Sequence, residues 1–331
     1  MNHPPYRLSI NKSVDRYLLV ELIRFAERLH CITMKKSSYF SLGGPFLIDQ
    51  KIIHSYFPYT KLISIENDIN TYKRQKRHIF CKSIKLIYKD VTQFISEQTF
   101  KRPAVFWLDF TRITKSYLDS IANLASKLPL GSIIKVTFNA STPYKPMQFN
   151  DKSKSEAEIK SRYESALNQV RSKFNDYINL VKFEQISEPK DYYRLMYNAV
   201  LHAIAKLQME RETPGFFIPC DFVTYSDTSP MMSISGIISS RDHIDEIKTA
   251  LQQYDFFSPE EPQNISMPDL SNIERYLIDK KLPTVCEDKL FSTLGYGIFP
   301  EEQDPFSDTK SLLKSYAKFW HKYPEFVRIM P

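Results

Sequence analysis

Short apolar runs alternate with stretches of helical periodicity over the first 140 residues of this chain. Five of these runs are typical of β-strands, and the fourth is apolar throughout, as expected of a parallel strand buried on both faces. The expected strands lie at residues 39–42, 61–65, 84–88, 104–108 and 132–138. The expected helices lie at 14–30, about 45–57, 68–77, 91–97 and 114–128. Strands separated by helices predict βαβ units, and right-handed crossovers make the parallel sheet doubly wound.

The pattern changes after residue 150. Apolar residues spaced three or four positions apart predict one long amphipathic helix over residues 152–181. The stripe that they form consists of Ile159, Tyr163, Ala166, Val170, Phe174, Tyr177 and Val181. A second helix is expected at about 191–209, and a third at 242–254. Between them, turn-forming residues join strand-like segments at 216–224 and 231–238, which predicts an antiparallel hairpin.

Together these elements predict an α/β protein with a doubly wound, mostly parallel, seven-stranded sheet of the Rossmann-like kind. A helical insertion occupies about residues 145–212. A proline-rich segment from Ser258 predicts a linker, and two further helices are expected at 270–281 and 309–320. We therefore divide the chain into a domain of residues 1–255 and a C-terminal extension of residues 256–331.

Cysteine usage and the first residues bear on metal binding and location. The four cysteines lie far apart and form no CxxC pair or Cys/His cluster, so the sequence predicts no zinc site. Scattered thiols suit a reducing compartment, and the first residues lack an apolar signal core. The most apolar early stretch, residues 17–25, is charged and too short to span a bilayer. These features predict a cytoplasmic protein with no membrane contact.

Candidate site residues follow the ends of four expected strands. Only 7 glycines occur in the chain, so the adjacent pair in Ser41-Leu42-Gly43-Gly44 stands out. Glu66, Asp90 and Asp109 end the next strands or follow them, where an open parallel sheet binds its ligands. Glu66 comes 22 positions after Gly44, a spacing that suits hydrogen bonds to ribose hydroxyls. Asp90 could accept a bond from an adenine amino group, although a helix cap is the more frequent role of such a residue.

The glycine turn restricts which nucleotide can bind. Bulky residues follow Gly44 where a G-x-G-x-x-G motif would place further glycines, and no G-x-x-x-x-G-K-[ST] motif is present. The sequence therefore favours S-adenosylmethionine, which has no phosphate group to hold. The hairpin at 216–238 also favours a protein that binds S-adenosylmethionine. In the sheet of class I methyltransferases, five parallel strands are followed by one reversed strand next to a parallel one.

Several runs resemble a family of bacterial proteins called putative O-methyltransferases. They are residues 40–49, 63–68, 73–75, 107–111 and 131–140. The resemblance covers roughly residues 38–140, with weaker similarity at 268–282. It implies the class I methyltransferase fold with S-adenosylmethionine as cofactor. By this resemblance the cofactor pocket is lined by Gly43, Gly44, Glu66, Asp90 and Asp109, although the glycine turn lacks the D/E-x-G-x-G-x-G pattern of well-studied class I enzymes.

The function expected from these residues is S-adenosylmethionine-dependent methyl transfer to an oxygen atom. Asp109 is the candidate catalytic residue, as a base or as an anchor for the amino group of the cofactor's methionine part. Its alternative role is to cap the helix that begins near Thr114. The alternative function is a catalytically silent module for nucleotide sensing or assembly with partner proteins.

Two surfaces are candidates for partner binding. The stripe of the 152–181 helix must cover the substrate cleft, a second subunit or another protein. Cations cluster on the helix at 68–77, where they either contact nucleic-acid phosphates or form a solvated face. This cluster contains Lys73, Arg74, Lys76 and Arg77. The formal net charge of +7 permits an anionic partner without requiring one.

Overall fold

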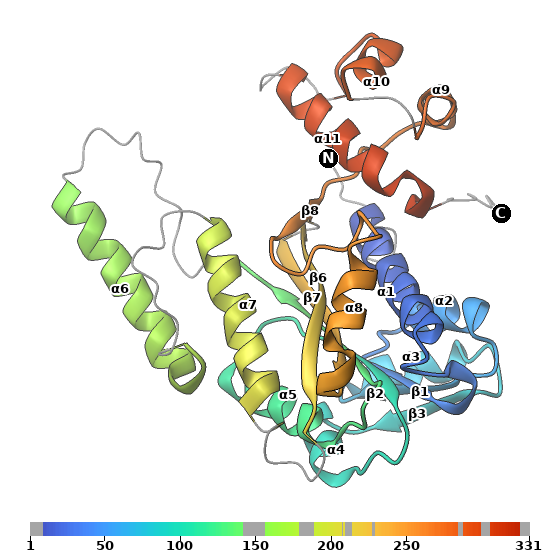
Figure 1. The fold of residues 1–331 in the computed structure, drawn as a ribbon, viewed down its shortest axis with the longest axis vertical. Helices are drawn as coiled ribbons and strands as arrows, with labels where there is room; N and C mark the ends of the chain where they lie inside the picture. Colours follow the sequence, from blue (N-terminus) through green and yellow to red (C-terminus); the bar gives the residue numbers. More distant parts are fainter. Residues whose placement is uncertain are drawn as a thin grey trace.

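The fold is built on one mixed sheet with helices on both faces (Figure 1). The computed structural model describes residues 9–141, 156–178, 189–206, 208, 214–226, 229–283, 287–298 and 305–324. Its eight strands run in the order β3-β2-β1-β4-β5-β7-β6-β8. They are β1 (Ser38–Ser41), β2 (Lys61–Glu66), β3 (Ile84–Tyr88), β4 (Ala104–Asp109), β5 (Ile133–Asn139), β6 (Phe216–Ser226), β7 (Pro230–Ser239) and β8 (Gln263–Ile265).

The predicted fold class is confirmed. Strands β1 to β5 pair in parallel, β7 runs antiparallel to β5, and β6 runs antiparallel to β7. All seven predicted strands are present within two residues of their expected bounds. The eighth strand, β8, lies in the segment that the sequence analysis read as a linker, and it pairs in parallel with β6. Three residues are too few to show the alternation by which a strand is recognised.

Every predicted helix is present, but some of the bounds differ from the expected ones. They are α1 (Ile10–Arg28), α2 (Ile48–Tyr56), α3 (Ile69–Arg77), α4 (Val91–Glu97), α5 (Lys115–Lys127), α6 (Glu156–Phe174), α7 (Pro189–Lys206), α8 (Ile244–Leu251), α9 (Asn272–Asp279), α10 (Glu287–Leu294) and α11 (Pro305–Phe319). Helix α10 was not predicted from the sequence. Helix α2 begins three residues later than expected, because Leu47 has a left-handed φ of 54° that a helix cannot contain.

Each face of the sheet has its own core. Phe106 of β4 and Ile134 of β5 face α4, α5 and α7, whereas Tyr39 of β1 and Trp107 of β4 face α1, α2 and α8. A third cluster joins α1 and β6 to the C-terminal helices, which Figure 1 shows gathered at one end of the molecule. The extension predicted from residue 256 thus begins with a segment that includes a strand of the sheet. The division of the chain at this residue stays a prediction.

The long helix of the insertion buries part of its stripe within its own chain. Val170, Phe174 and Tyr177 are buried in the core with α5 and α7, and the Tyr177 hydroxyl donates to Asp119 Oδ1 at 2.5 Å. These side chains are therefore not a docking surface, and the α-helix ends at Phe174, before a 3₁₀ turn. The structure does not describe the other four side chains of the stripe, so their predicted roles are not tested. They are Ile159, Tyr163, Ala166 and Val181. Among the described helices, none is long and apolar enough to cross a membrane.

A buried carboxylate lies where β8 joins the sheet. Asp221 is almost fully buried at an irregularity of β6, and Gln263 of β8 donates to its Oδ1 at 2.9 Å. Asp221 Oδ2 has no hydrogen-bond partner in the described part of the chain. Burial raises the pKa of Asp221 to about 7, although the nearby Lys135 ammonium opposes this rise.

The raised pKa of Asp221 predicts a pH-dependent stability. Its folded value of about 7 lies above the unfolded value of about 3.9, so this group's contribution is fully present below pH 4 and is lost as the pH rises through 7. We expect Asp221→Asn to lose less stability than the unmodified chain between pH 5 and pH 8. Thermal melting across this range measures the difference. The exposed Asp242→Asn is the control, and parallel curves for all three proteins would contradict the prediction.

Candidate functional site

The predicted site residues meet at one edge of the sheet. Ser41, Glu66 and Asp109 are the last residues of β1, β2 and β4, and Asp90 immediately precedes α4. These strands are parallel, so their carboxyl ends share one edge. The contacts divide the residues into two groups: the glycine turn with Glu66 and Asp90, and Asp109 with α1.

The glycine turn is closed on one side and open on the other. A Cβ atom at position 43 would lie 2.3 Å from Ser64 Oγ and 2.5 Å from Gln50 Nε2, so any larger residue would displace the Ser64 and Gln50 side chains. Gly44 has a φ of +51°, and no atom lies within 4 Å of the position that its Cβ would take. The backbone of Gly44 is therefore accessible on that side, as a turn that meets a ligand must be.

Two fully buried glutamines hold this turn from inside. Gln50 Nε2 donates to Ser41 Oγ at 2.6 Å, and Gln75 Nε2 donates to the carbonyl of Gly44 at 2.9 Å. Ser64 Oγ donates to Gln75 Oε1 at 3.2 Å, which connects the turn to β2. Ser41 is thus buried and part of the support of the turn. Neither glutamine was predicted as a site residue. Gln75 stands among cations and so resembles a surface residue.

Glu66 is half-buried at the end of β2 and has no role as a helix cap. The capping residue of α3 is Asp68, whose Oδ1 accepts a bond from the Thr71 backbone N–H at 2.7 Å. Glu66 Oε1 accepts from the Asp68 backbone N–H at 2.9 Å. Burial raises the pKa of Glu66, and these backbone hydrogen bonds partly offset the rise. The backbone of the loop after β2 therefore helps to hold this carboxylate at the sheet edge.

Asp90 is the N-cap of α4. Its Oδ1 accepts from the backbone N–H groups of Thr92 at 2.8 Å and Gln93 at 3.3 Å. Partial burial raises the pKa of Asp90, but these hydrogen bonds outweigh burial and hold the pKa below its usual value. Asn67 Nδ2 also donates to Asp90 Oδ2 at 3.4 Å. Because Asn67 follows Glu66, this contact ties the ends of β2 and β3 together.

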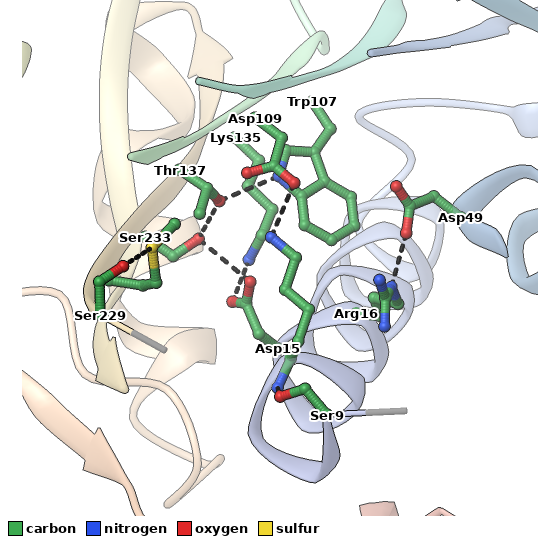
Figure 2. A network of polar contacts seen from close by, with 12 residues as sticks. Ser9, Asp15, Arg16, Asp49, Trp107, Asp109, Lys135, Thr137, Ser229 and Ser233 are labelled. Carbon is green, nitrogen blue, oxygen red and sulfur yellow. Dashed lines mark hydrogen bonds and ion pairs between the residues drawn. The ribbon is translucent and has the colours of Figure 1, made fainter. Parts of the chain in front are cut away.

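Asp109 forms an ion pair with the buried Lys12 of α1, at 2.9 Å between Nζ and Oδ2 (Figure 2). The alternative expected from the sequence, a cap of α5, is wrong. The N-cap of α5 is Thr114, whose hydroxyl accepts from the Tyr117 backbone N–H at 3.3 Å. The structure therefore shows that the carboxylate of Asp109 holds a primary ammonium group.

The same face of α1 carries two more ion pairs. Asp15 binds Lys135 of β5 at 2.6 Å, with exposed side-chain fractions of 0% and 1%, and Arg16 binds Asp49 of α2 at 2.6 Å. Figure 2 shows these side chains pointing from α1 toward the sheet and α2. On a helix, residues spaced three and four apart share one face, so the sequence pattern resembled a solvated surface. The lysine within the apolar run of β5 was the one signal of a buried partner.

Trp107 lies beside both lysines of this network. The Lys12 and Lys135 ammonium nitrogens lie 4.8 and 5.2 Å from the centre of the indole ring. The indole N–H donates to Thr137 Oγ1 at 2.9 Å, and that hydroxyl is hydrogen-bonded to Ser233 Oγ at 2.7 Å. Trp107 is therefore a buried core residue whose ring lies close to both cations.

The described residues contain no cluster of side chains suited to a metal ion. No group of three or more His, Cys, Asp or Glu side chains among the described residues could hold a metal ion. Three of the four cysteines, Cys31, Cys81 and Cys220, lie in the described segments, and all three are free thiols. The fourth cysteine, Cys286, is not among the described residues, so the prediction that it takes no part in a zinc site is not tested.

Removal of Lys135 should destabilise the protein strongly. Lys135→Met leaves the Asp15 carboxylate buried without its cation, so we expect the free energy of unfolding to fall by about 3–5 kcal/mol. Asp15→Leu with Lys135→Met should cost less than the single change, because no unpaired charge remains. Urea denaturation measures both. Lys115→Met, which breaks an exposed pair with Asp176, is the control and should have little effect. An equally small effect of Lys135→Met would contradict the prediction.

The chain matches one family model and several solved structures. A putative O-methyltransferase from Klebsiella pneumoniae has a TM-score of 0.38 and 10% identity, over 72% of this chain and 84% of that one. The LepI complex with SAM has a TM-score of 0.34 and 10% identity, over 65% of this chain and 46% of LepI. The S-adenosylmethionine-dependent methyltransferase SibL has a TM-score of 0.33 and 9% identity, over 68% of this chain and 55% of SibL.

The chain thus covers about half the length of LepI and of SibL. None of the curated proteins matches it. The family model described as "Putative O-methyltransferase" matches residues 4–331, which is nearly the whole sequence and includes the turn, the carboxylates and α1. The chain belongs to this O-methyltransferase family.

Proposed function

We propose that this protein transfers a methyl group from S-adenosylmethionine to an oxygen atom of an acceptor. One observation carries the proposal: the accessible backbone of Gly44 lies at the carboxyl edge of the sheet that also carries Glu66. The sheet itself has the strand pattern expected of a class I methyltransferase, with the reversed β7 between β5 and β6. Membership of the O-methyltransferase family supports the same reaction.

The residues at this edge fit the adenosine part of the cofactor. Gly43 and Gly44 offer backbone without side chains, and the Glu66 carboxylate can accept hydrogen bonds from two ribose hydroxyls. We keep Asp90 as the proposed acceptor for the adenine amino group, since a carboxylate has about four acceptor positions. Ser41 contributes through its contact with Gln50, which shapes the turn.

Asp109 is the proposed anchor for the amino group of the cofactor's methionine part. Its contact with the Lys12 ammonium group shows that this carboxylate can hold such a group, which favours the anchor over the general base. When bound, S-adenosylmethionine supplies a methyl group attached to a positively charged sulfur. The protein's task is then to hold the acceptor oxygen in line with that methyl group and to exclude water.

The alternative function, a silent assembly module, has less support. It relied on the glycine turn, which lacks the usual pattern, and on an exposed 152–181 helix, but Val170, Phe174 and Tyr177 of that helix are buried within the chain's own core. The methyl acceptor is the partner that the proposed reaction requires. A cytoplasmic location, expected from the scattered cysteines, belongs to this proposal as well.

The role of Glu66 is tested by cofactor binding. Glu66→Ala should weaken binding of S-adenosylmethionine by about 1.5–3 kcal/mol, the range for hydrogen bonds to a charged group. Gly44→Val should weaken it further, because a β-branched side chain at positive φ distorts the turn and fills the accessible side. Isothermal titration calorimetry measures both variants. Glu97→Ala, at the far end of α4, is the control. Unchanged affinity in a folded Glu66→Ala protein would contradict the proposed pocket.

The role of Asp109 is tested with its partner removed as well. Asp109→Asn should weaken cofactor binding by about 1.5–3 kcal/mol, and it also leaves the buried Lys12 ammonium without its carboxylate. The double variant Lys12→Met with Asp109→Asn removes both charges. It should therefore be more stable than Asp109→Asn alone, yet bind S-adenosylmethionine as weakly as that single variant. Calorimetry and thermal melting separate the two effects. Wild-type affinity in the folded double variant would exclude Asp109 as the anchor.

A further inference from the structure

The positive charge of this protein is concentrated in one segment. Residues 69–89 contain seven lysines and arginines and no aspartate or glutamate. They are Lys73, Arg74, Lys76, Arg77, Lys82, Lys85 and Lys89. Their number equals the formal net charge of the whole chain, +7, so the remaining residues are neutral in sum. We call this segment, which comprises α3, the following loop, β3 and Lys89, the basic edge.

The basic edge lies on the outside of the molecule. Strand β3 ends the sheet, and α3 packs beside it (Figure 1). Six of the seven cations are exposed, and Lys89 is partly exposed and paired with Glu97. Lysines on a terminal strand protect it from pairing with other chains, which can account for Lys85 and Lys89. Protection of the strand does not account for the four cations of α3, nor for the aromatic rings of the basic edge.

Aromatic rings alternate with these cations. Tyr88 and Phe80 are 51% and 38% exposed. The Tyr72 ring packs against Tyr88 at 5.3 Å, and the Lys76 ammonium nitrogen lies 4.7 Å from the centre of the Tyr72 ring. The Lys51 ammonium nitrogen lies 5.8 Å from the Phe80 ring. Exposed rings beside exposed cations can stack nucleic-acid bases while the cations bind the phosphates.

The basic edge is continuous with the carboxyl edge of the sheet. Phe46, two residues after Gly44, lies 4.8 Å from the Arg74 guanidinium and 5.2 Å from the His78 ring. Tyr88 pairs in register with Glu66. A strand lying on the basic edge would therefore pass close to the glycine turn.

We propose that the basic edge binds a single-stranded nucleic acid, with phosphates on the cations of α3 and β3 and bases on Tyr88 and Phe80. This inference does not depend on the proposed methyl transfer. An anionic membrane is the competing occupant, because Ile69, Ile79 and Phe80 are exposed beside the cations. It explains the surface less well, since α3 itself carries only two apolar residues and has no inserting face. An acidic protein would use the cations but would leave the stacking rings without a role.

The first experiment measures binding of the full chain to a fluorescent oligouridylate of about 20 nucleotides by anisotropy, across a salt series. The test variant is Lys73→Glu with Arg77→Glu and Lys85→Glu. The control, Lys173→Glu with Lys248→Glu and Lys289→Glu, makes the same charge change at exposed cations of α6, α8 and α10. We expect the test variant to lose at least about tenfold in affinity and its log–log salt slope to fall by about 2. Equal losses in both variants, or no binding by the unmodified chain, would overturn the proposal.

The second experiment separates nucleic acid from other polyanions. Tyr88→Ala should weaken oligouridylate binding about tenfold, leave the salt slope unchanged and leave inorganic polyphosphate binding unaffected, because only bases stack. Tyr88→Phe should restore the affinity, since it keeps the ring. An unaltered affinity in Tyr88→Ala would overturn the proposed stacking. Binding to phosphatidylserine vesicles without binding to the oligonucleotide would assign the surface to a membrane instead.

Discussion

The buried ion pair between Asp15 and Lys135 constrains much of this structure. A charged lysine inside an apolar strand is stable only when an opposite charge is buried beside it. Lys135 of β5 therefore requires α1 to pack on the sheet in the one position that brings Asp15 to its ammonium group. The helix geometry then fixes the neighbouring contacts: Lys12 reaches Asp109, and Arg16 reaches the start of α2. Charge pairs and apolar residues such as Leu22 together hold α1 to the sheet. Val14 and Leu18 of the same helix pack with the C-terminal helices.

The two halves of the candidate site are held by different physical means. Neutral amides support the glycine turn: Gln50 and Gln75 bind it from α2 and α3. The carboxylate of Asp109 is held by a charge on α1. The two supports meet on α2, where Asp49 binds Arg16 of α1 and the next residue, Gln50, binds Ser41. Neighbouring contacts of this kind are energetically coupled, so a substitution in one half of the site is expected to affect the other.

The sequence predicted the strands and strand ends well, and their side-chain contacts poorly. Each main strand is a run of at least four mostly apolar residues, so the ends at Glu66 and Asp109 followed from the runs themselves. The partner of Asp109 did not, because Lys12 lies 97 positions earlier and occupies a helix position that resembles a solvated one. Strand β8 was missed since its three residues show no alternation, and the capping role of Thr114 became visible only with the helix boundary.

Two groups of cations in this protein have opposite consequences. Lys12, Arg16 and Lys135 are buried against carboxylates, so their charges cancel within a few ångströms and contribute little outside. The seven cations of the basic edge have no acid within their own segment. Neighbouring residues of one helix or strand lie within the Debye length of about 8 Å, so their potentials add. The field at this edge is therefore stronger than an isoelectric point near 9.0 suggests, and an approaching polyanion would be drawn to this side of the molecule.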